Sequence, residues 1–354
     1  MSKVVLTCDQ LVERNWTTAI FETFLDLIED AEIFTLVHRP KAILGPAELR
    51  RIHSSYLSKF VEKENDLFKW SFLIPGAAKN LHISCTVDTV INISRGLSQG
   101  IKRCDKSKQI TYLIDELPWT TEPILLRDRL FRSRLKKWAK DQLCEVDELW
   151  VTNQEQKDLF EGLVPKVEVV APFFKTHEYP LFPKTQRELF PHDFVTIEAT
   201  DLSLDKAQNL IDKLESSHIK YRFVGFDDQL SSLKKENEDT RFYGPRCAGE
   251  MAPMLAASIA LIDFSTSSFH ENALATLATG RPVLTLKGFS KLENISSGVF
   301  SFENIDKIID WSKNHVGDKF HDNALEWHKS VQGFSEVLFQ KRVKELLADK
   351  NILH

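Results

Sequence analysis

The chain has 354 residues, a formal net charge of −5 and 42% hydrophobic residues. This length and apolar content suffice for two domains with cores of ordinary size. The acidic balance argues against a nucleic-acid-binding protein, which needs a basic face or stripe. The sequence contains no run of about 18 apolar residues, so we expect no transmembrane helix.

In the first half, short apolar runs alternate with amphipathic segments. This alternation is typical of an α/β protein with a parallel sheet covered by helices on both faces. We expect helices at residues 16–28, 125–143 and 154–163. The expected strands are residues 4–7, 32–36, 89–93, 109–114, 148–151 and 167–170.

Residues 171–192 are rich in proline and show no helical period, which predicts a linker. The alternation then restarts, with expected strands at 194–197, 221–224, 241–243, 259–262 and 282–286. Expected helices cover 204–216, 248–256 and 269–279, and the tail 324–350 predicts one or two more. The predicted organisation is therefore an N-terminal domain 1–171, a linker 172–192, a C-terminal domain 193–335 and a closing helix 336–354.

Ligands of doubly wound sheets bind beyond the carboxyl ends of the strands. We therefore expect the functional site in the loops that directly follow the strands of both domains.

The five cysteines are Cys8, Cys85, Cys104, Cys144 and Cys247. Their number is odd, no pair has metal-ligand spacing, and the N-terminal residues show no secretion signal. These features predict reduced thiols in a cytoplasmic protein, and no metal site.

The run 127–140 (RDRLFRSRLKKWAK) is the one strongly basic stretch. We favour a solvated helix face, in which Leu130, Leu135 and Trp138 face the core. The alternative is a patch for anionic lipid headgroups or a partner, which would allow peripheral contact with the inner face of a membrane.

Several segments resemble family 4 glycosyltransferases, most closely the mannosyltransferase-like branch of O-antigen and lipopolysaccharide assembly. In the first half they are IFETFLDLIEDAEIFTLVHRP, VDTVINISRGLSQGI and DELWVTNQEQKDLF; in the second they are TDLSLDKAQNLI, RFYGPRCAGEMAPMLAASIALIDFS and ATLATGRPVL. The resemblance spans nearly the whole chain. It implies the GT-B fold, with two Rossmann-like domains facing across a cleft and a C-terminal helix packing back toward the first domain.

The resemblance implies retaining transfer of a hexose, such as mannose, from a GDP- or UDP-linked sugar, without a metal or other cofactor. The implied acceptor is lipid-linked or a polysaccharide of the cell envelope, and a partner glycosyltransferase is a further expectation. Members of the family hold the donor with an Arg, a Lys and two glutamates, beside a Gly-rich first loop.

Aligning ATGRPVL with the family places the two glutamate positions at Ser267 and Ala275, which are not acidic. Glu271 lies one helical turn from each. It either replaces one of the acids as a catalytic residue or is a glutamate favoured by the helix dipole. His270 stands where a glycine is usual and would narrow the donor pocket. Ser267 and Ser268 begin the helix and are candidates to bind the donor phosphates.

Elsewhere the family positions are also replaced. Asp201 takes the place of the Arg, whereas Lys206 matches the Lys and either binds phosphate or is a surface lysine. The first loop has no glycine. Thr17 or Thr18 is a candidate to cap the following helix, and Thr17 is a candidate to contact the donor. Arg95 stands where the family often has a histidine.

Arg14, Arg95 and Lys102 could form a different anion site. We favour instead that they pair with acids of the same sheet edge, which are Asp9, Asp115 and Glu116.

Two functions remain open at this point. The chain is either a divergent glycosyltransferase or a non-catalytic relative that binds a partner protein or a glycan. The replacement of several donor-binding residues motivates the second hypothesis.

Overall fold

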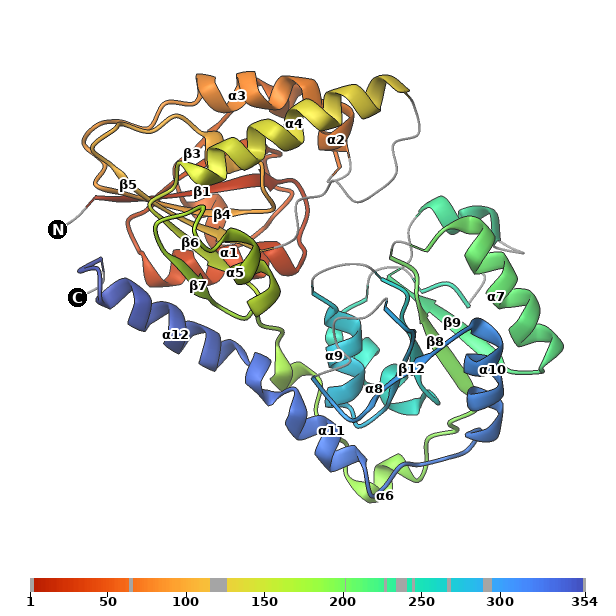
Figure 1. The fold of residues 1–354 in the computed structure, drawn as a ribbon. Coiled ribbons are helices and arrows are strands. Elements are labelled where there is room, and N and C mark those ends of the chain that lie inside the picture. The colour runs from red at the N-terminus through yellow and green to blue at the C-terminus, as the bar shows by residue number, and fades with distance from the viewer. Residues whose placement is uncertain are drawn as a thin grey trace. The chain divides into compact units, whose positions relative to one another are not determined.

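The computed structural model describes residues 3–63, 66–114, 126–200, 202–225, 228–233, 241–243, 246–265, 269–288 and 295–352. The chain divides into two compact units (Figure 1). Unit 1 comprises Met1–Phe173 and Val337–His354, and unit 2 comprises Phe174–Glu336.

Unit 1 contains a seven-stranded parallel sheet with the order β3-β2-β1-β4-β5-β6-β7. Its strands are β1 (Val4–Leu11), β2 (Glu32–His38), β3 (Ile52–Ser54), β4 (Thr89–Ser94), β5 (Lys108–Leu113), β6 (Glu148–Val151) and β7 (Val167–Val169). Most of β1 and all of β4 are buried, as expected for central strands covered on both faces. Thr7 of β1 lies opposite Asn92 of β4, and the Thr7 hydroxyl donates to the Asn92 side chain at 2.6 Å.

The helices of unit 1 are α1 (Trp16–Leu27), α2 (Asp66–Lys69), α3 (Ile74–Asn80), α4 (Leu126–Cys144), α5 (Gln154–Phe160) and α12 (Glu336–Ala348). Helix α1 begins at a capping box: the Asn15 side chain accepts from the Thr18 backbone N–H at 3.0 Å, and the Thr18 hydroxyl accepts from the Asn15 N–H at 2.7 Å. Helix α12 returns to unit 1 and buries Phe339 against Phe24 and Tyr112. This return confirms the expected closing helix.

Unit 2 contains a five-stranded parallel sheet with the order β12-β11-β10-β8-β9. Its strands are β8 (Phe194–Glu198), β9 (Lys220–Val224), β10 (Leu261–Ile262), β11 (Val283–Leu286) and β12 (Val299–Phe302). Its helices are α6 (Lys184–Arg187), α7 (Leu204–Ser216), α8 (Ala248–Ala257), α9 (Glu271–Ala278), α10 (Ile305–Asn314) and α11 (Ala324–Ser330). The α/β prediction with two parallel sheets is thus confirmed.

The observed elements differ from the expected ones in several places. Residues 241–243 form an isolated bridge between Phe223 and Phe242 instead of a strand. The segment 171–192 contains the short helix α6. Strands β3 and β12 were not expected, because each is a short strand whose residues are at most half-buried, with no continuous apolar run.

The prediction that all cysteines are reduced was also wrong, because Cys85 and Cys104 form a disulfide. Cys85 lies before β4 and Cys104 lies before β5, so the two cysteines are 19 positions apart in the sequence yet meet at the amino ends of neighbouring strands. Cys8 is buried, whereas Cys144 and Cys247 are exposed, and all three are free thiols.

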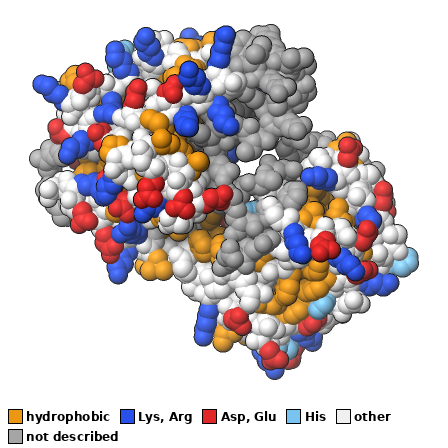
Figure 2. All heavy atoms as spheres, viewed as in Figure 1, with side chains coloured by type: hydrophobic (Ala, Val, Ile, Leu, Met, Phe, Trp, Pro, Cys, Tyr) orange, Lys and Arg blue, Asp and Glu red, His pale blue; other side chains and the backbone are white. Residues whose placement is uncertain are grey.

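The basic run of α4 presents Arg134, Lys136, Lys137 and Lys140 to solvent while Leu135 is buried. This exposure agrees with the favoured solvated helix face. Charged side chains of both signs are interspersed on the faces of both units seen in Figure 2. Within the described ranges, no helix is both long enough and apolar enough to cross a bilayer.

Candidate functional site

Two acids lie together at the carboxyl edge of the sheet of unit 2. Glu198 is the last residue of β8, and Asp263 directly follows β10, the neighbouring strand. Both side chains are buried. The pKa of Glu198 is raised because burial disfavours the charged carboxylate and because Asp263 adds a like charge. A raised carboxyl pKa in a strand-end site is a common mark of a functional position.

Glu198 is held by defined partners. Its carboxylate accepts from Asn272 Nδ2 at 2.6 Å and from the Thr200 backbone N–H at 3.0 Å. Gly225 follows β9 with φ +65°, and a Cβ there would overlap a Glu198 carboxylate oxygen. The glycine therefore leaves the space that the carboxyl group occupies.

Asp263 holds the imidazole of His270. Nδ1 of His270 lies 2.8 Å from Oδ2 of Asp263, and Oδ1 of Asp263 accepts from the Ser265 N–H at 2.8 Å. When the ring is neutral, a carboxylate beside Nδ1 favours the proton on that nitrogen, and Nε2 is then a hydrogen-bond acceptor. Nε2 is buried and has no partner among the residues that the structure describes. A ligand hydroxyl is the kind of donor that this nitrogen lacks.

Glu271, the predicted catalytic residue, is the first residue of α9 and is half-buried. Its pKa is raised by burial first and then by the like charge of Glu178, while Lys175 opposes the shift. The charged neighbours of Glu271 therefore belong to the segment 175–179. The Glu198 cluster is contacted by the next residue, Asn272, and not by Glu271. A catalytic role for Glu271 stays a prediction.

The other predicted donor-side residues have different outcomes. His270, a predicted donor-binding residue, joins the buried cluster. Lys206 is exposed in the first turn of α7. Ser267 and Ser268 lie outside the described residues, as does Asp201.

Unit 1 has a pocket at the carboxyl ends of β1, β4 and β5, with about 430 Å³ of unfilled space that is partly open to solvent. Both predicted residues of this unit, Thr17 and Arg95, line it. Its other lining residues are Cys8, Asp9, Gln10, Leu11, Val12, Glu13, Asn15, Thr18, Phe21, Ile93 and Ile114. Burial raises the pKa of the Cys8 thiol to about 12, which makes it a poor nucleophile.

Asp9 positions the loop that carries Arg95. Its buried carboxylate accepts from the Ser94 hydroxyl at 2.7 Å, the Arg95 N–H at 2.6 Å and the Ser98 N–H at 2.7 Å. Three hydrogen bonds to one carboxylate hold the chain after β4 in a fixed course. The hydroxyl of Thr17 donates to Asn15 Oδ1 at 2.7 Å, so Thr17 supports the cap of α1.

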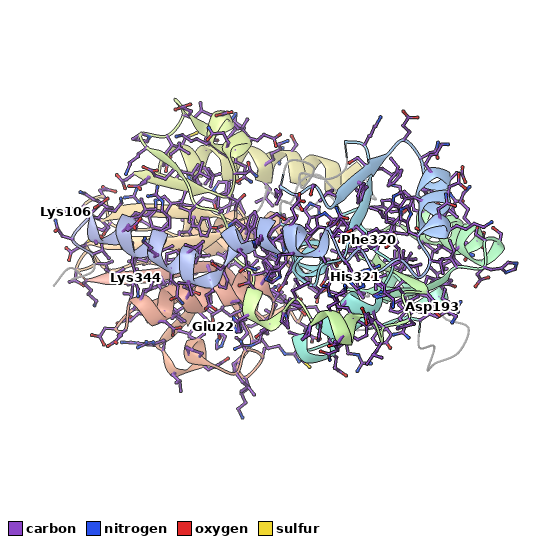
Figure 3. All side chains as sticks on the ribbon, turned by 90° about the horizontal axis from the view of Figure 1, so that it is seen from below. Glu22, Lys106, Asp193, Phe320, His321 and Lys344 are labelled. Atoms are coloured by element: carbon purple, nitrogen blue, oxygen red, sulfur yellow. A yellow bond between two sulfur atoms is a disulfide. The ribbon has the colours of Figure 1, made fainter. Side chains whose placement is uncertain are left out.

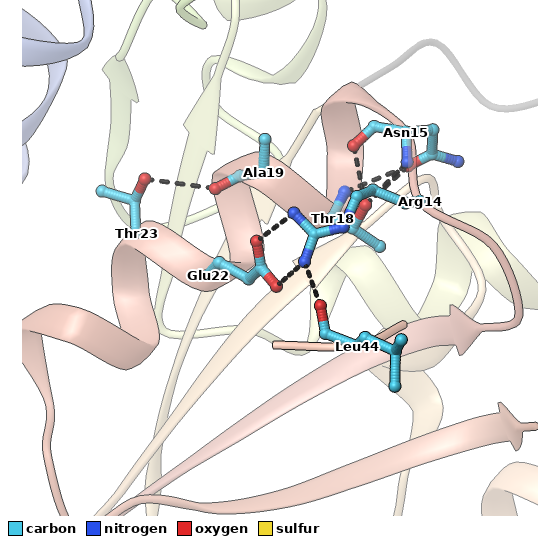
Figure 4. A network of polar contacts seen from close by, with 7 residues as sticks. All are labelled: Arg14, Asn15, Thr18, Ala19, Glu22, Thr23 and Leu44. Carbon is cyan, nitrogen blue, oxygen red and sulfur yellow. Dashed lines mark hydrogen bonds and ion pairs between the residues drawn. The ribbon is translucent and has the colours of Figure 1, made fainter. Parts of the chain in front are cut away.

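The structure corrects the expectation for Arg14. Its guanidinium binds Glu22 of α1 at 2.7 and 3.0 Å and the Leu44 carbonyl at 2.8 Å (Figure 4). It is therefore neither part of an anion site nor paired with Asp9. Lys102 is exposed, and Asp115 and Glu116 lie outside the described residues.

The sequence reasoning missed Glu198, Asp263 and Asn272. The available signal was an acid directly after a buried apolar run, in FVTIE and LIDF. The sequence did not show that β8 and β10 are neighbours, which is known from the order of strands in the sheet. Within the described ranges, no group of three His, Cys, Asp or Glu side chains is placed to hold a metal ion.

The fold matches solved structures over nearly the whole chain. Sucrose-phosphate synthase from Thermosynechococcus elongatus is 11% identical, with 99% of each chain covered and a TM-score of 0.69. Alr3699/HepE of Anabaena, solved in complex with UDP-glucose, is 14% identical, with 98% of this chain and 99% of that chain covered and a TM-score of 0.63. The lipopolysaccharide outer core galactosyltransferase WaaB is 13% identical, with 98% and 99% covered and a TM-score of 0.57.

These likenesses establish that the chain has the GT-B fold. No protein-family model matches the sequence, and no curated protein matches it.

Proposed function

We propose that this chain is a glycosyltransferase-like protein whose unit 2 binds a nucleotide-sugar at the carboxyl edge of β8 and β10. The observation that carries the proposal is the buried cluster in which Asn272 holds Glu198 and Asp263 holds His270. It occupies the edge at which open α/β sheets bind ligands. The fold supports the same reading, since structures of this architecture include one with bound UDP-glucose.

The chemistry of the cluster suits the sugar better than the diphosphate. Carboxylate oxygens and the Nε2 lone pair of His270 accept hydrogen bonds, and the hydroxyls of a hexose can donate them. The diphosphate needs positive charge, for which Lys206 and the amino end of α9 are the candidates on this side of unit 2. In this proposal His270 and Glu198 orient the hexose, and Lys206 offsets the charge of the leaving nucleotide.

The finer parts of the proposal rest on the sequence resemblance. They are membership of family 4, retaining transfer of a hexose such as mannose from a GDP- or UDP-linked donor, and a lipid-linked or polysaccharide acceptor of the cell envelope. Peripheral contact with a membrane belongs to the same proposal, because the described basic residues of α4 are exposed.

A second candidate function is a non-catalytic relative that binds a glycan or a partner glycosyltransferase. The observation that favours it is the acidity of the site, in which the buried Glu198 and Asp263 lie at the ends of neighbouring strands. Buried carboxylates repel a diphosphate, whereas they bind the hydroxyls of a neutral glycan.

Titration of the purified protein with UDP- and GDP-linked hexoses, by calorimetry and thermal unfolding, tests the proposal. A donor at 100 times its dissociation constant should stabilise unit 2 by about 2.7 kcal/mol. We expect His270→Ala to weaken binding, and Lys213→Gln, which alters a residue in the last turn of α7 that pairs with Asp306, to leave it unchanged. Failure of every nucleotide-sugar to bind at millimolar concentration would overturn the proposal and favour the second function.

A further inference from the structure

A group of basic side chains gathers at the opposite, amino edge of the sheet of unit 2. His192 lies just before β8, and Arg281 lies just before β11. The segment 317–321, between α10 and α11, crosses this edge beside α6 at the lower end of unit 2 in Figure 1. Figure 3, viewed from below, labels Phe320 and His321 of that segment.

Arg281 is the buried centre of the group, with 1% of its surface exposed. Nη1 donates to the Asp318 carbonyl at 3.0 Å and Nη2 donates to the Ile259 carbonyl at 2.7 Å, while the guanidinium lies 4.7 Å from the ring centre of Phe320. Nε is buried and has no partner among the described residues. Carbonyl oxygens satisfy donors but do not neutralise the charge, and burial lowers the pKa of Arg281 to about 9.

Arg187 adds to this positive charge, and His192 lies beside it. The Arg187 Nε and Nη1 atoms are buried and have no partner within the described ranges. Both ring nitrogens of His192 face carbonyl oxygens, at 3.3 Å to Ser258 and 3.2 Å to Arg187. Burial, and then the charge of Arg281, lowers the pKa of His192, so protonation of this ring is opposed by its surroundings.

Lys319 and His321 complete the group. Lys319 Nζ donates to the Glu188 carbonyl at 3.2 Å, and Nδ1 of His321 is a buried nitrogen without a partner in the part of the chain that the structure describes. Two acids of these segments lie nearby, and the charge of Asp318 opposes the lowering of the Arg281 pKa. The Glu188 carboxylate is 47% exposed and lies 3.9 Å from His321 Nε2, and the Asp318 carboxylate accepts from the Phe320 N–H.

We propose that this amino-edge cluster, defined as Arg187, His192, Arg281, Lys319 and His321, binds a phosphate-class oxyanion. The anion is either free phosphate or the phosphate group of a small phosphate ester. Its oxygens accept several hydrogen bonds at once, and guanidinium and ammonium groups are the preferred partners of phosphate in proteins.

The proposal goes beyond the nucleotide-sugar function, because the site lies at the other end of the strands from Glu198 and Asp263. A bound dianion would add negative charge beside Arg281 and Arg187, whose buried nitrogens lack partners among the described residues. It would also hold together three segments that are distant in the sequence, namely 187–192, Arg281 and 317–321. Binding should therefore raise the stability of unit 2.

The test is calorimetry and thermal unfolding of the full chain with inorganic phosphate, with glycerol 2-phosphate, and with chloride at matched ionic strength. We expect saturable binding of at least one of the first two and none with chloride. Arg187→Gln should weaken that binding at least tenfold. Arg246→Gln is the matched control, since it removes a guanidinium from the surface of the same unit and should leave the affinity unchanged.

Two further variants distinguish failure of the phosphate proposal from misfolding and from failure of the nucleotide-sugar proposal. His321→Gln should also weaken phosphate binding, which covers the case in which Arg187→Gln does not fold. His270→Ala should leave phosphate binding intact while weakening nucleotide-sugar binding. The amino-edge site would be overturned if the phosphate affinity were unchanged in both Arg187→Gln and His321→Gln. It would also be overturned if phosphate binding were lost in His270→Ala or by competition with UDP. Each of these outcomes would leave the nucleotide-sugar proposal standing.

Discussion

Asp263 and His270 form a buried pair at the carboxyl edge of unit 2, in which Nδ1 of the imidazole lies 2.8 Å from the carboxylate. The side chains are 2% and 1% exposed, so water cannot replace either partner. Since the aspartate determines which ring nitrogen carries the proton, it also determines what His270 can offer a ligand.

This pair should contribute measurably to stability. Asp263→Ala leaves Nδ1 of His270 and the Ser265 N–H without their acceptor, and we expect a loss of about 1–3 kcal/mol in the free energy of unfolding. Urea denaturation of Asp263→Ala, His270→Ala and the double variant forms a double-mutant cycle, with an expected coupling of about 0.5–3 kcal/mol. If the two single losses simply add, the hydrogen bond does not stabilise the fold.

Glu271 should make stability depend on pH. Its pKa in the folded protein is raised above the ordinary value of 4.5, mainly by burial. A carboxyl group with a raised pKa in the folded protein destabilises the fold once it ionises. This penalty is absent at pH values below the pKa of the group in the unfolded chain, and it is complete at pH values above the pKa in the folded protein. Glu271→Gln removes this penalty and should be more stable than the parent chain at pH 7 but not at pH 4.

Urea denaturation at both pH values checks this prediction. Glu303→Gln is the control, because Glu303 is 74% exposed and pairs with Lys287 at the surface. A Glu271→Gln variant that is no more stable than the parent chain at pH 7 would show that the buried carboxylate carries no such penalty.

The sequence predicts the central elements of both sheets well. The runs that became β1, β4 and β8 are apolar and long enough to bury on both faces, and α7 has its expected bounds of 204–216. Edge strands such as β3 escaped prediction, since they carry no such run. Short edge strands are held by pairing with a neighbour, and that pairing is a property of the tertiary structure.

The site was predictable only in part. The loops after the strands could be expected to carry it, because parallel strands end at one edge. The pairing of Glu198 with Asn272 joins residues 74 positions apart, and the Arg14–Glu22 pair depends on the close approach of residues 44 and 45. Contacts of this kind leave no periodic signal in the sequence. The Cys85–Cys104 disulfide also leaves no such signal, and the odd cysteine count predicted reduced thiols instead.

Gly225 should be sensitive to an added methyl group. Its φ of +65° already disfavours a side chain by about 1–2 kcal/mol. A Cβ would in addition meet the Glu198 carboxylate and lie 3.0 Å from Thr200 Oγ1. Gly288→Ala is the matched control, since Gly288 has φ +77° and a Cβ there would meet no described residue within 4 Å. Denaturation should show a clearly larger loss for Gly225→Ala, and equal losses would mean that Glu198 moves aside without cost.

The disulfide of unit 1 should respond to reductant. A cross-link that closes a loop of about 15 residues stabilises a fold by about 3 kcal/mol in the chain-entropy account, and Cys85 and Cys104 are 19 positions apart. Dithiothreitol should therefore lower the unfolding temperature of the parent chain. It should have no effect on a Cys85→Ser, Cys104→Ser double variant, which should resemble the reduced parent. A parent chain that is insensitive to reductant, with two titratable thiols at these positions, would contradict the pairing.

Arg14 and Arg95 should differ as determinants of ligand binding in unit 1. The Arg14 side chain is 50% exposed and engaged by Glu22, whereas Arg95 lines the pocket at the end of β4. Arg14→Ala should cost less than about 1 kcal/mol of stability, because an exposed ion pair contributes little, and it should leave ligand affinity unchanged. Arg95→Ala keeps the backbone N–H that binds Asp9, so the loop should hold its course.

Any nucleotide-sugar or glycan found to bind unit 1 should therefore lose affinity in Arg95→Ala alone. Calorimetry on the two variants, with circular dichroism to verify folding, distinguishes them. A loss of affinity in Arg14→Ala equal to that in Arg95→Ala would mean that Arg14 leaves Glu22 to reach the ligand, and would restore the anion site first expected from the sequence.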